Sequence, residues 1–161
     1  MLSGKAILLT CALLSPLYKQ APAIRVVDTD QLKQRVQNTA SDTLYVVNFW
    51  ATWCKPCVQE LPWFEKASET FRNNKVKVIL VSLDSPEEGG KVEKFAAVKG
   101  LKNELYLLNG GNPNVWINAI DSSWSGAIPA TVYYRKGAKL AFHEGDYEQA
   151  SLDSTINKLI Q

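Results

Sequence analysis

The sequence has few of the residues that build metal centres or disulfide-rich scaffolds: one histidine, one methionine and three cysteines among 161 residues. These numbers do not make up a usual four-ligand zinc site, and they are too small for a miniprotein held together by several disulfides. An excess of charge is also missing, because 18 basic residues are matched by 16 acidic ones. A net charge of +2 provides no broad positive surface for nucleic acid. Any cysteine chemistry must therefore be local, and nucleic-acid binding is not expected.

Internal repeats, low-complexity tracts and long apolar runs are absent from the sequence as well. The most apolar segment, residues 6–14, is nine residues long and too short to cross a bilayer. Hydrophobic residues make up 46% and charged residues 21%, which is typical of a globular protein. A length of 161 residues fits one domain with one core.

The N-terminal segment has the features of a signal peptide. Lys5 precedes the apolar run, and Ala-Pro-Ala at residues 21–23 supplies the small residues that signal peptidase prefers. We expect residues 1–23 to be cleaved after Ala23, leaving a domain of residues 24–161 in the periplasm or cell envelope. Alternatives are lipidation at Cys11, an uncleaved anchor, or a buried first helix of a cytosolic protein.

Cleavage would change both the charge and the cysteine content. Removing Lys5 and Lys19 from the basic residues makes the numbers of bases and acids equal at 16. Removing Cys11 leaves Cys54 and Cys57 as the only thiols of a chain exported to an oxidising compartment. These two cysteines must then react with each other or with a partner.

The remaining sequence alternates β-prone runs with amphipathic stretches, which predicts an α/β sheet protein. The predicted order is β-α-β-α-β with an inserted strand and helix, followed by β-β-α. Strands are expected at residues 43–50, 76–83, 104–108, 130–135 and 139–143, and helices at 29–38, 55–73, 92–99, 113–120 and 149–160.

The segment that carries chemistry is Trp-Cys-Lys-Pro-Cys at residues 53–57, between a predicted buried strand and a predicted helix. Unpaired N–H groups and the dipole at a helix N-terminus favour an anion, so Cys54 is expected to ionise near neutral pH. Cys54 would attack as the thiolate and form a mixed disulfide, which Cys57 would resolve. Lys55 adds positive charge beside the thiolate, and Pro56 fits the first helical turn.

Three other interpretations of the cysteine pair stay open. Half of a zinc site would need further ligands, but His143 is the only histidine and there is no second cysteine pair. A purely structural disulfide would close a very small loop and add little stability. Copper delivery suits soft thiolates, but the only methionine, Met1, lies in the predicted leader. The pattern therefore favours redox chemistry.

The residues around the pair resemble a known family. Residues 47–57 (VNFWATWCKPC), followed by Glu-Leu-Pro at 60–62, are similar to the active-site segment of extracytoplasmic thioredoxin-like proteins of the TlpA/ResA type. Residues 81–84 and 126–131 extend this resemblance, which runs from Thr29 to the C-terminal helix. It implies the thioredoxin fold, with a central mixed β-sheet flanked by helices and a β-α insertion before the strand that follows a cis proline.

The resemblance also implies roles for residues near the cysteines. The Ile128–Pro129 bond is expected to be cis and to face the pair; an ordinary trans proline is the alternative. The backbone of Ile128 would pair with an extended client segment. Trp53, Lys55 and Pro56 are the other residues expected to contact the client.

Proton transfer requires a separate residue. Thioredoxins carry a buried Asp where this chain has Asn48, and an amide does not exchange protons. Glu60 lies three residues after Cys57, one turn further on the same side of the helix, and matches an acidic residue of the TlpA/ResA type. We expect Glu60 to assist the deprotonation of Cys57. The alternative interpretation is a solvated surface carboxylate.

Two tryptophans of the inserted segment, Trp116 and Trp124, are expected to be buried in packing; contact with a partner protein is the alternative. His143 is expected to be structural rather than catalytic.

These observations and the resemblance together predict an exported thiol-disulfide oxidoreductase without metal or organic cofactor. The resemblance implies a reducing role, with electrons received from a membrane-bound thiol donor and passed to disulfide-containing or dithiol client proteins, apocytochrome c among them. The positive charge of Lys55 favours the reduced form and hence oxidant behaviour, so an oxidase or isomerase is one alternative. A non-catalytic, metal-carrying binding module is the other. A monomer is expected.

Overall fold

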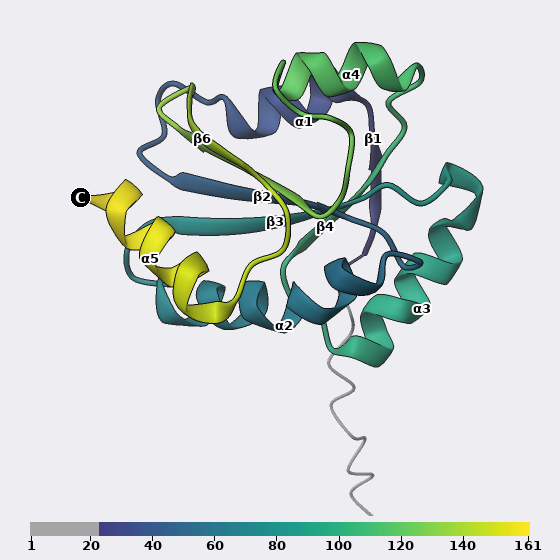
Figure 1. Ribbon diagram of the computed structural model, residues 1–161, viewed down its shortest axis with the longest axis horizontal. Helices are drawn as coiled ribbons and strands as arrows, with labels where there is room; N and C mark the ends of the chain where they lie inside the picture. Colours follow the sequence, from purple (N-terminus) through teal and green to yellow (C-terminus); the bar gives the residue numbers. More distant parts are fainter. Residues whose placement is uncertain (1–22) are drawn as a thin grey trace, which may run out of the picture.

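A six-stranded mixed sheet runs through the middle of the computed structural model, which describes residues 23–161 (Figure 1). The strand order is β1-β4-β3-β2-β5-β6. Strands β1, β4, β3 and β2 are parallel, whereas β5 pairs antiparallel with β2 and β6 pairs antiparallel with β5. The strands are β1 (Arg25–Val27), β2 (Leu44–Trp50), β3 (Val76–Ser82), β4 (Glu104–Leu108), β5 (Ala130–Arg135) and β6 (Ala138–Glu144).

Helices cover both faces of this sheet. They are α1 (Thr29–Val36), α2 (Lys55–Thr70), α3 (Gly89–Lys99), α4 (Pro113–Ile120) and α5 (Gln149–Ile160), with a short 3-10 turn at Pro86–Glu88. Helices α1 and α4 lie on one face, and α2, α3 and α5 lie on the other (Figure 1). The predicted α/β architecture, a central mixed sheet flanked by helices, is confirmed.

Strand β2 lies in the interior and separates the two hydrophobic cores. All seven of its residues are buried, as its nearly continuous apolar sequence predicts. Val46 and Trp50 belong to the core under α2, α3 and α5, whereas Val47 and Phe49 belong to the core under α1 and α4. Because side chains alternate along a strand, Asn48 points to the α2 face, together with Val46 and Trp50.

The predicted insertion before β5 consists of β4 and α4. Strand β4 pairs with β3 on one side and with β1 on the other, so the insertion widens the parallel part of the sheet. Strand β1 was missed by the sequence analysis. Its three residues are mostly exposed and too few to show a hydrophobic period, and they form a strand because they pair with residues 106–108 of β4.

The ends of the helices follow from local sequence. Pro56 lies in the first turn of α2, as predicted, where its missing N–H leaves no hydrogen bond unmade. Helix α3 ends at Gly100, which has the left-handed φ of 67° that glycine adopts at low cost. The same helix begins at Gly89, three residues before the predicted start at residue 92.

The predicted signal peptide lies, except for Ala23, outside the described residues, and so does Cys11. Within residues 23–161, no helix has the length and apolar character needed to cross a membrane.

Candidate active site

The two cysteines lie where β2 gives way to α2. Cys54 is the N-cap residue of α2 and is joined to Cys57 by a disulfide, with 5.3 Å between the two Cα atoms. The backbone N–H of Cys57 points at the Cys54 Sγ at 3.3 Å. The first turn of α2 carries no acidic residue. After reduction, negative charge on the Cys54 sulfur would face a backbone N–H group and the positive end of a helix dipole.

The two sulfurs differ in their access to solvent. Cys57 is completely buried, whereas Cys54 retains 6% of its surface and lies next to Trp53, which is 68% exposed. Lys55 and Pro56 are also exposed. These three exposed residues border Cys54, so a partner protein that reaches the pair must meet Cys54 first.

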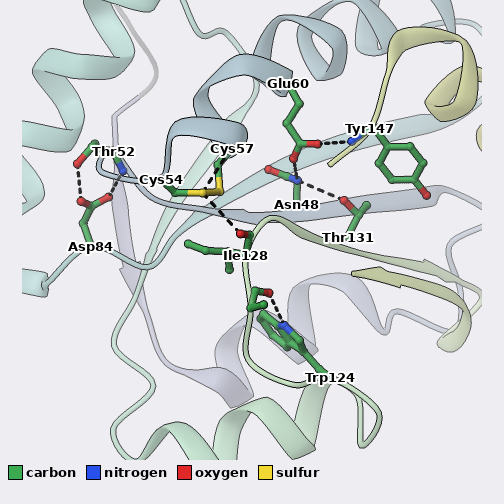
Figure 2. Close-up of a disulfide and its surroundings, with 11 residues drawn as sticks. Asn48, Thr52, Cys54, Cys57, Glu60, Asp84, Trp124, Ile128, Thr131 and Tyr147 are labelled. Atoms are coloured by element: carbon green, nitrogen blue, oxygen red, sulfur yellow. Dashed lines mark hydrogen bonds between the residues drawn. A yellow bond between two sulfur atoms is a disulfide. The ribbon is translucent and has the colours of Figure 1, made fainter. Parts of the chain in front are cut away.

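The Ile128–Pro129 peptide bond is cis, as predicted, and the loop that contains it faces the cysteine pair. The Cys54 Sγ lies 3.7 Å from the carbonyl oxygen of Ile128 (Figure 2). On the other side of this loop, the indole Nε1 of Trp124 donates to the carbonyl of Ala127 at 2.8 Å (Figure 2). The buried indole of Trp124 therefore fixes the backbone of the loop that faces the cysteine pair.

The aromatic packing behind this loop confirms the prediction for the inserted tryptophans. Trp116 and Trp124 are both buried and meet edge to face, with 5.3 Å between their ring centroids. The ring centroids of Trp124 and Phe49 are also 4.9 Å apart. The aromatic cluster therefore packs the loop against strand β2, which contains Phe49. His143, expected to be structural, packs against Tyr147 with the two rings tilted by 37° and 4.2 Å between their centroids.

Glu60 is buried in the interior, with only 1% of its surface exposed. Its Oε1 accepts a hydrogen bond from Asn48 Nδ2 at 2.7 Å, and its Oε2 accepts one from the backbone N–H of Tyr147 at 2.7 Å (Figure 2). The interpretation as a solvated surface carboxylate is therefore wrong. Its partners in the structure are an amide and a backbone group rather than a cysteine.

The environment of Glu60 changes its proton affinity. Burial raises the pKa of this carboxyl from 4.5 to about 7, because the charged form is desolvated; the hydrogen bonds from Tyr147 and Asn48 act in the opposite direction and offset part of this effect. A carboxyl with this pKa can both take up and release a proton near neutral pH.

A second buried carboxylate, missed by the sequence analysis as a site residue, anchors the loop before Cys54. Asp84 accepts hydrogen bonds from the backbone N–H of Thr52 at 2.9 Å, from the Thr52 hydroxyl at 2.5 Å and from the Ser82 hydroxyl at 2.6 Å. Its only signal in the sequence was the resemblance of residues 81–84 to the family. The contact spans 32 residues, so only the folded sheet brings Asp84 to Thr52.

We expect Asp84→Ala to lower the free energy of unfolding by about 3 kcal/mol, because it leaves the partly buried donors of Thr52 and the buried hydroxyl of Ser82 without an acceptor. Urea unfolding followed by tryptophan fluorescence measures this change. Ser82→Ala removes only one of the donors and should cost about 1 kcal/mol. An unchanged unfolding midpoint for Asp84→Ala would show that the carboxylate does not anchor the loop.

Potential metal ligands do not gather in the described part of the chain. Among residues 23–161, no group of three or more His, Cys, Asp or Glu side chains is placed to hold a metal ion.

Comparisons with known proteins place this chain in a family. The profile of the AhpC/TSA family matches residues 17–142, which is most of the chain. A thioredoxin of Malassezia sympodialis is 32% identical over 99 residues, 62% of this chain and 89% of the relative. The thiol-disulfide oxidoreductase ResA of Bacillus thuringiensis (strain Al Hakam) is 32% identical over 84 residues, 52% of this chain and 47% of the relative. The chain thus spans about half the length of this ResA relative.

The fold is also found among solved structures. A thiol:disulfide interchange protein of the thioredoxin family from Chlorobium tepidum TLS superposes with a TM-score of 0.61 at 20% identity, over 75% of this chain and 82% of that one. At this identity the likeness supports the fold alone, and it confirms the predicted thioredoxin-like architecture. The chain therefore belongs to the AhpC/TSA family, as a thioredoxin-like protein related to the thiol-disulfide oxidoreductases.

Proposed function

We propose that this thiol-disulfide oxidoreductase is exported and reduces disulfides of proteins outside the cytoplasm. The observation that carries the proposal is the arrangement of the pair: Cys54 caps a helix and faces the Ile128 carbonyl, while Cys57 is completely buried behind it. This arrangement gives one sulfur for attack and a second for resolution.

The reaction transfers two electrons in two exchange steps. The Cys54 thiolate attacks one sulfur of a client disulfide, so a Cys54–client bond forms and the other client sulfur leaves as a thiolate. The Cys57 thiolate then attacks Cys54, forming the intramolecular disulfide and releasing the second client thiolate. The client gains two electrons, and this protein loses two. A dithiol donor reverses the change by reducing the Cys54–Cys57 disulfide.

The surface around Cys54 supplies the client-binding contacts in this proposal. An extended client segment would pair with the backbone of Ile128, next to Pro129, and this would place its disulfide against Cys54. Trp53, with most of its ring exposed, would pack on the same segment. Main-chain pairing of this kind tolerates different client sequences.

Glu60 takes the proton of Cys57 during resolution in this account. Its pKa of about 7 lets the ionised carboxylate act as a base at neutral pH. Cys57 and Glu60 lie three residues apart on α2, and neighbouring turns of a helix bring such positions to one side. The completely buried Cys57 has no direct access to solvent as a proton acceptor.

We further propose how the protein is exported, which kind of protein supplies its electrons and which class of client it reduces. Residues 1–23 would be the signal peptide, and a membrane-bound thiol protein would supply electrons. Strand β1 begins at Arg25, so cleavage after Ala23 would leave every described strand and helix intact. Apocytochrome c, which must be reduced before haem attachment, is one client class that the TlpA/ResA resemblance suggests.

A test in cells would follow the tagged full-length chain. Cell fractionation and the mass of the processed N-terminus measure export and the cleavage site, and alkylation of free thiols after acid quenching measures the redox state. We expect processing after Ala23, an extracytoplasmic location and a mostly reduced pair. An uncleaved cytoplasmic chain would refute export, and a mostly oxidised pair would refute the reducing direction.

An oxidant of exported proteins is the second candidate, favoured by one observation. Lys55 is exposed in the first turn of α2, next to Cys54, and that turn has no acidic residue to offset its charge. A positive charge here stabilises the Cys54 thiolate, and therefore the reduced form, and so raises the redox potential.

We expect Lys55→Glu to lower the redox potential by about 10–40 mV, because reversing one exposed charge near a helix N-terminus changes the thiolate energy by about 0.5–2 kcal/mol. Lys55→Gln should give roughly half this shift. Lys66→Glu, the same charge reversal at an exposed position of α2 far from the pair, is the matched control. Equal shifts for Lys55→Glu and Lys66→Glu in thiol/disulfide buffers would contradict a local effect of Lys55.

A further inference from the structure

A buried polar atom on the face of β2 that α2 covers has no hydrogen-bond partner. The side chain of Asn48 is completely buried, and its Nδ2 donates to Glu60 Oε1 at 2.7 Å and to Thr131 Oγ1 at 3.2 Å. Its Oδ1 is buried without a partner. With Glu60 ionised, exchanging the two ends of the amide would not help, because it would place Oδ1 against a carboxylate oxygen that has no proton to donate. A buried carbonyl oxygen without a donor is unfavourable and uncommon in folded proteins.

The position of Asn48 shows which group can become its donor. Asn48 lies on the face of β2 that α2 covers, and Glu60, which it contacts, is one helical turn from Cys57 on the same side of α2. Figure 2 shows the amide between the disulfide and the Glu60 carboxylate, with its nitrogen toward Glu60 and its oxygen on the side of Cys57. The sulfur of Cys57 carries no proton while the disulfide is intact.

We propose that Asn48 Oδ1 accepts a hydrogen bond from the thiol of Cys57 in the reduced protein. Reduction of the disulfide by a dithiol donor adds two electrons; one proton gives Cys57 an S–H group, and Cys54 either takes up the second proton or releases it to remain a thiolate. This group replaces the missing donor at Oδ1, between two side chains that are buried from bulk solvent. The inference rests on the proposed function only in that the reduced state belongs to the working cycle.

The amide would then connect the two groups that exchange a proton in the proposed mechanism. Its oxygen holds the Cys57 thiol, and its nitrogen donates to the Glu60 carboxylate. Asn48 itself does not carry the proton; it orients donor and acceptor and polarises both. Because the hydrogen bond to Oδ1 exists only after reduction, it stabilises the reduced form and raises the redox potential.

The stretching vibration of the Cys57 S–H group tests the inference directly, because hydrogen bonding lowers its frequency. Infrared or Raman spectra would be recorded on the full chain carrying Cys11→Ser and Cys54→Ser, so that Cys57 is the only thiol. We expect the S–H band of Cys57 at a lower frequency in the folded chain than in the urea-unfolded chain. A band at the unfolded position would overturn the inference, whether or not any Asn48 variant folds.

Variants then assign the acceptor. Asn48→Leu removes Oδ1 and keeps a side chain of similar volume. The frequency of the Cys57 S–H band should then rise toward the frequency of a free thiol. Thr131→Val is the matched control, because it removes a partner of Nδ2 and leaves Oδ1 in place, so the band should stay where it is. A band that stays in place in Asn48→Leu, or that moves equally in Thr131→Val, would overturn the assignment to Asn48.

The equilibrium with a reference dithiol gives a second readout. Without the hydrogen bond of the reduced state, Asn48→Leu in the otherwise unchanged chain should favour the disulfide about fivefold more than the unmodified protein does. No change, or a change toward the reduced form, would contradict the inference. These measurements need neither client nor electron donor in the cell, so an unshifted band refutes the Asn48 contact alone, and a wrong location or redox state in cells refutes the proposed function alone.

Discussion

Cys57→Ser will trap the protein as a stable mixed disulfide with its client, whereas Cys54→Ser will form no such adduct. The reason is the order of access: Cys54 lies beside the exposed Trp53, whereas Cys57 is completely buried behind it. Without Cys57 the first exchange still occurs, but the resolving thiolate is missing. Both variants should reduce turnover of a model protein disulfide to the uncatalysed rate.

The adducts are measured by mass spectrometry after reaction with a disulfide-bonded peptide and acid quenching. Cys11→Ser is the matched control, since it removes the third cysteine and should leave turnover unchanged. In Cys57→Ser, the pKa of the Cys54 thiol should lie at least about one unit below the ordinary value of about 8.5, because of the helix N-terminus. An adduct formed by Cys54→Ser through Cys57 would reverse the assigned roles.

Glu60→Gln will flatten the pH dependence of stability between pH 5 and 8. The pKa of Glu60 is raised from 4.5 to about 7 in the folded protein, so between these values the folded chain binds more protons than the unfolded chain. This contribution to stability is fully present below pH 4.5 and is lost as the pH rises through 7. From pH 5 to pH 8 the loss amounts to about 2–3 kcal/mol in the wild type.

Urea unfolding of the oxidised protein at a series of pH values measures this dependence. The difference between wild type and Glu60→Gln isolates Glu60, because His143 and the other titrating groups are present in both proteins. Glu69→Gln, an exposed position on the same helix, should retain the wild-type dependence. Parallel stability curves for wild type and Glu60→Gln would show that the pKa of Glu60 is not raised.

The same variant tests the proton transfer. In the wild type, the rate of resolution of the Cys54 mixed disulfide should fall as the pH drops below about 7, because Glu60 becomes protonated and no longer acts as a base. Glu60→Gln should resolve slowly at every pH. Unchanged thiol titrations and unchanged turnover in Glu60→Gln would remove Glu60 from the mechanism.

Much of the fold could be predicted because local sequence and packing agree. Strand β2 is buried on both faces and reads as an unbroken β-prone run, and the helix that follows begins with Cys54 as its cap and Pro56 in its first turn. The disulfide-bonded pair was evident for the same reason: the chemistry proposed for Cys54 and Cys57 depends on being at a helix start, which a short sequence segment defines. Strand β1 was missed because pairing with β4, and not its own sequence, makes it a strand.

The surroundings of the pair could not be predicted in the same way. Whether Glu60 was solvated or buried depended on Tyr147, whose backbone N–H reaches it from 87 residues away. The contact between Asp84 and Thr52 likewise joins the ends of neighbouring strands. Helical spacing places a residue on one side of a helix, but it does not predict which other segments of the chain pack against that side.

The equilibrium redox potential of the purified protein tests the central claim most directly. Free thiols would be trapped and counted across graded thiol/disulfide buffers. Cys54→Ser is the control, because it cannot form the Cys54–Cys57 disulfide. The account predicts a reversible two-electron couple near the reducing end of the known range, at about −270 mV or lower. A value near −120 mV, roughly that of a strong oxidant, would contradict the reducing role, and the absence of any reversible couple would favour a binding module on this fold.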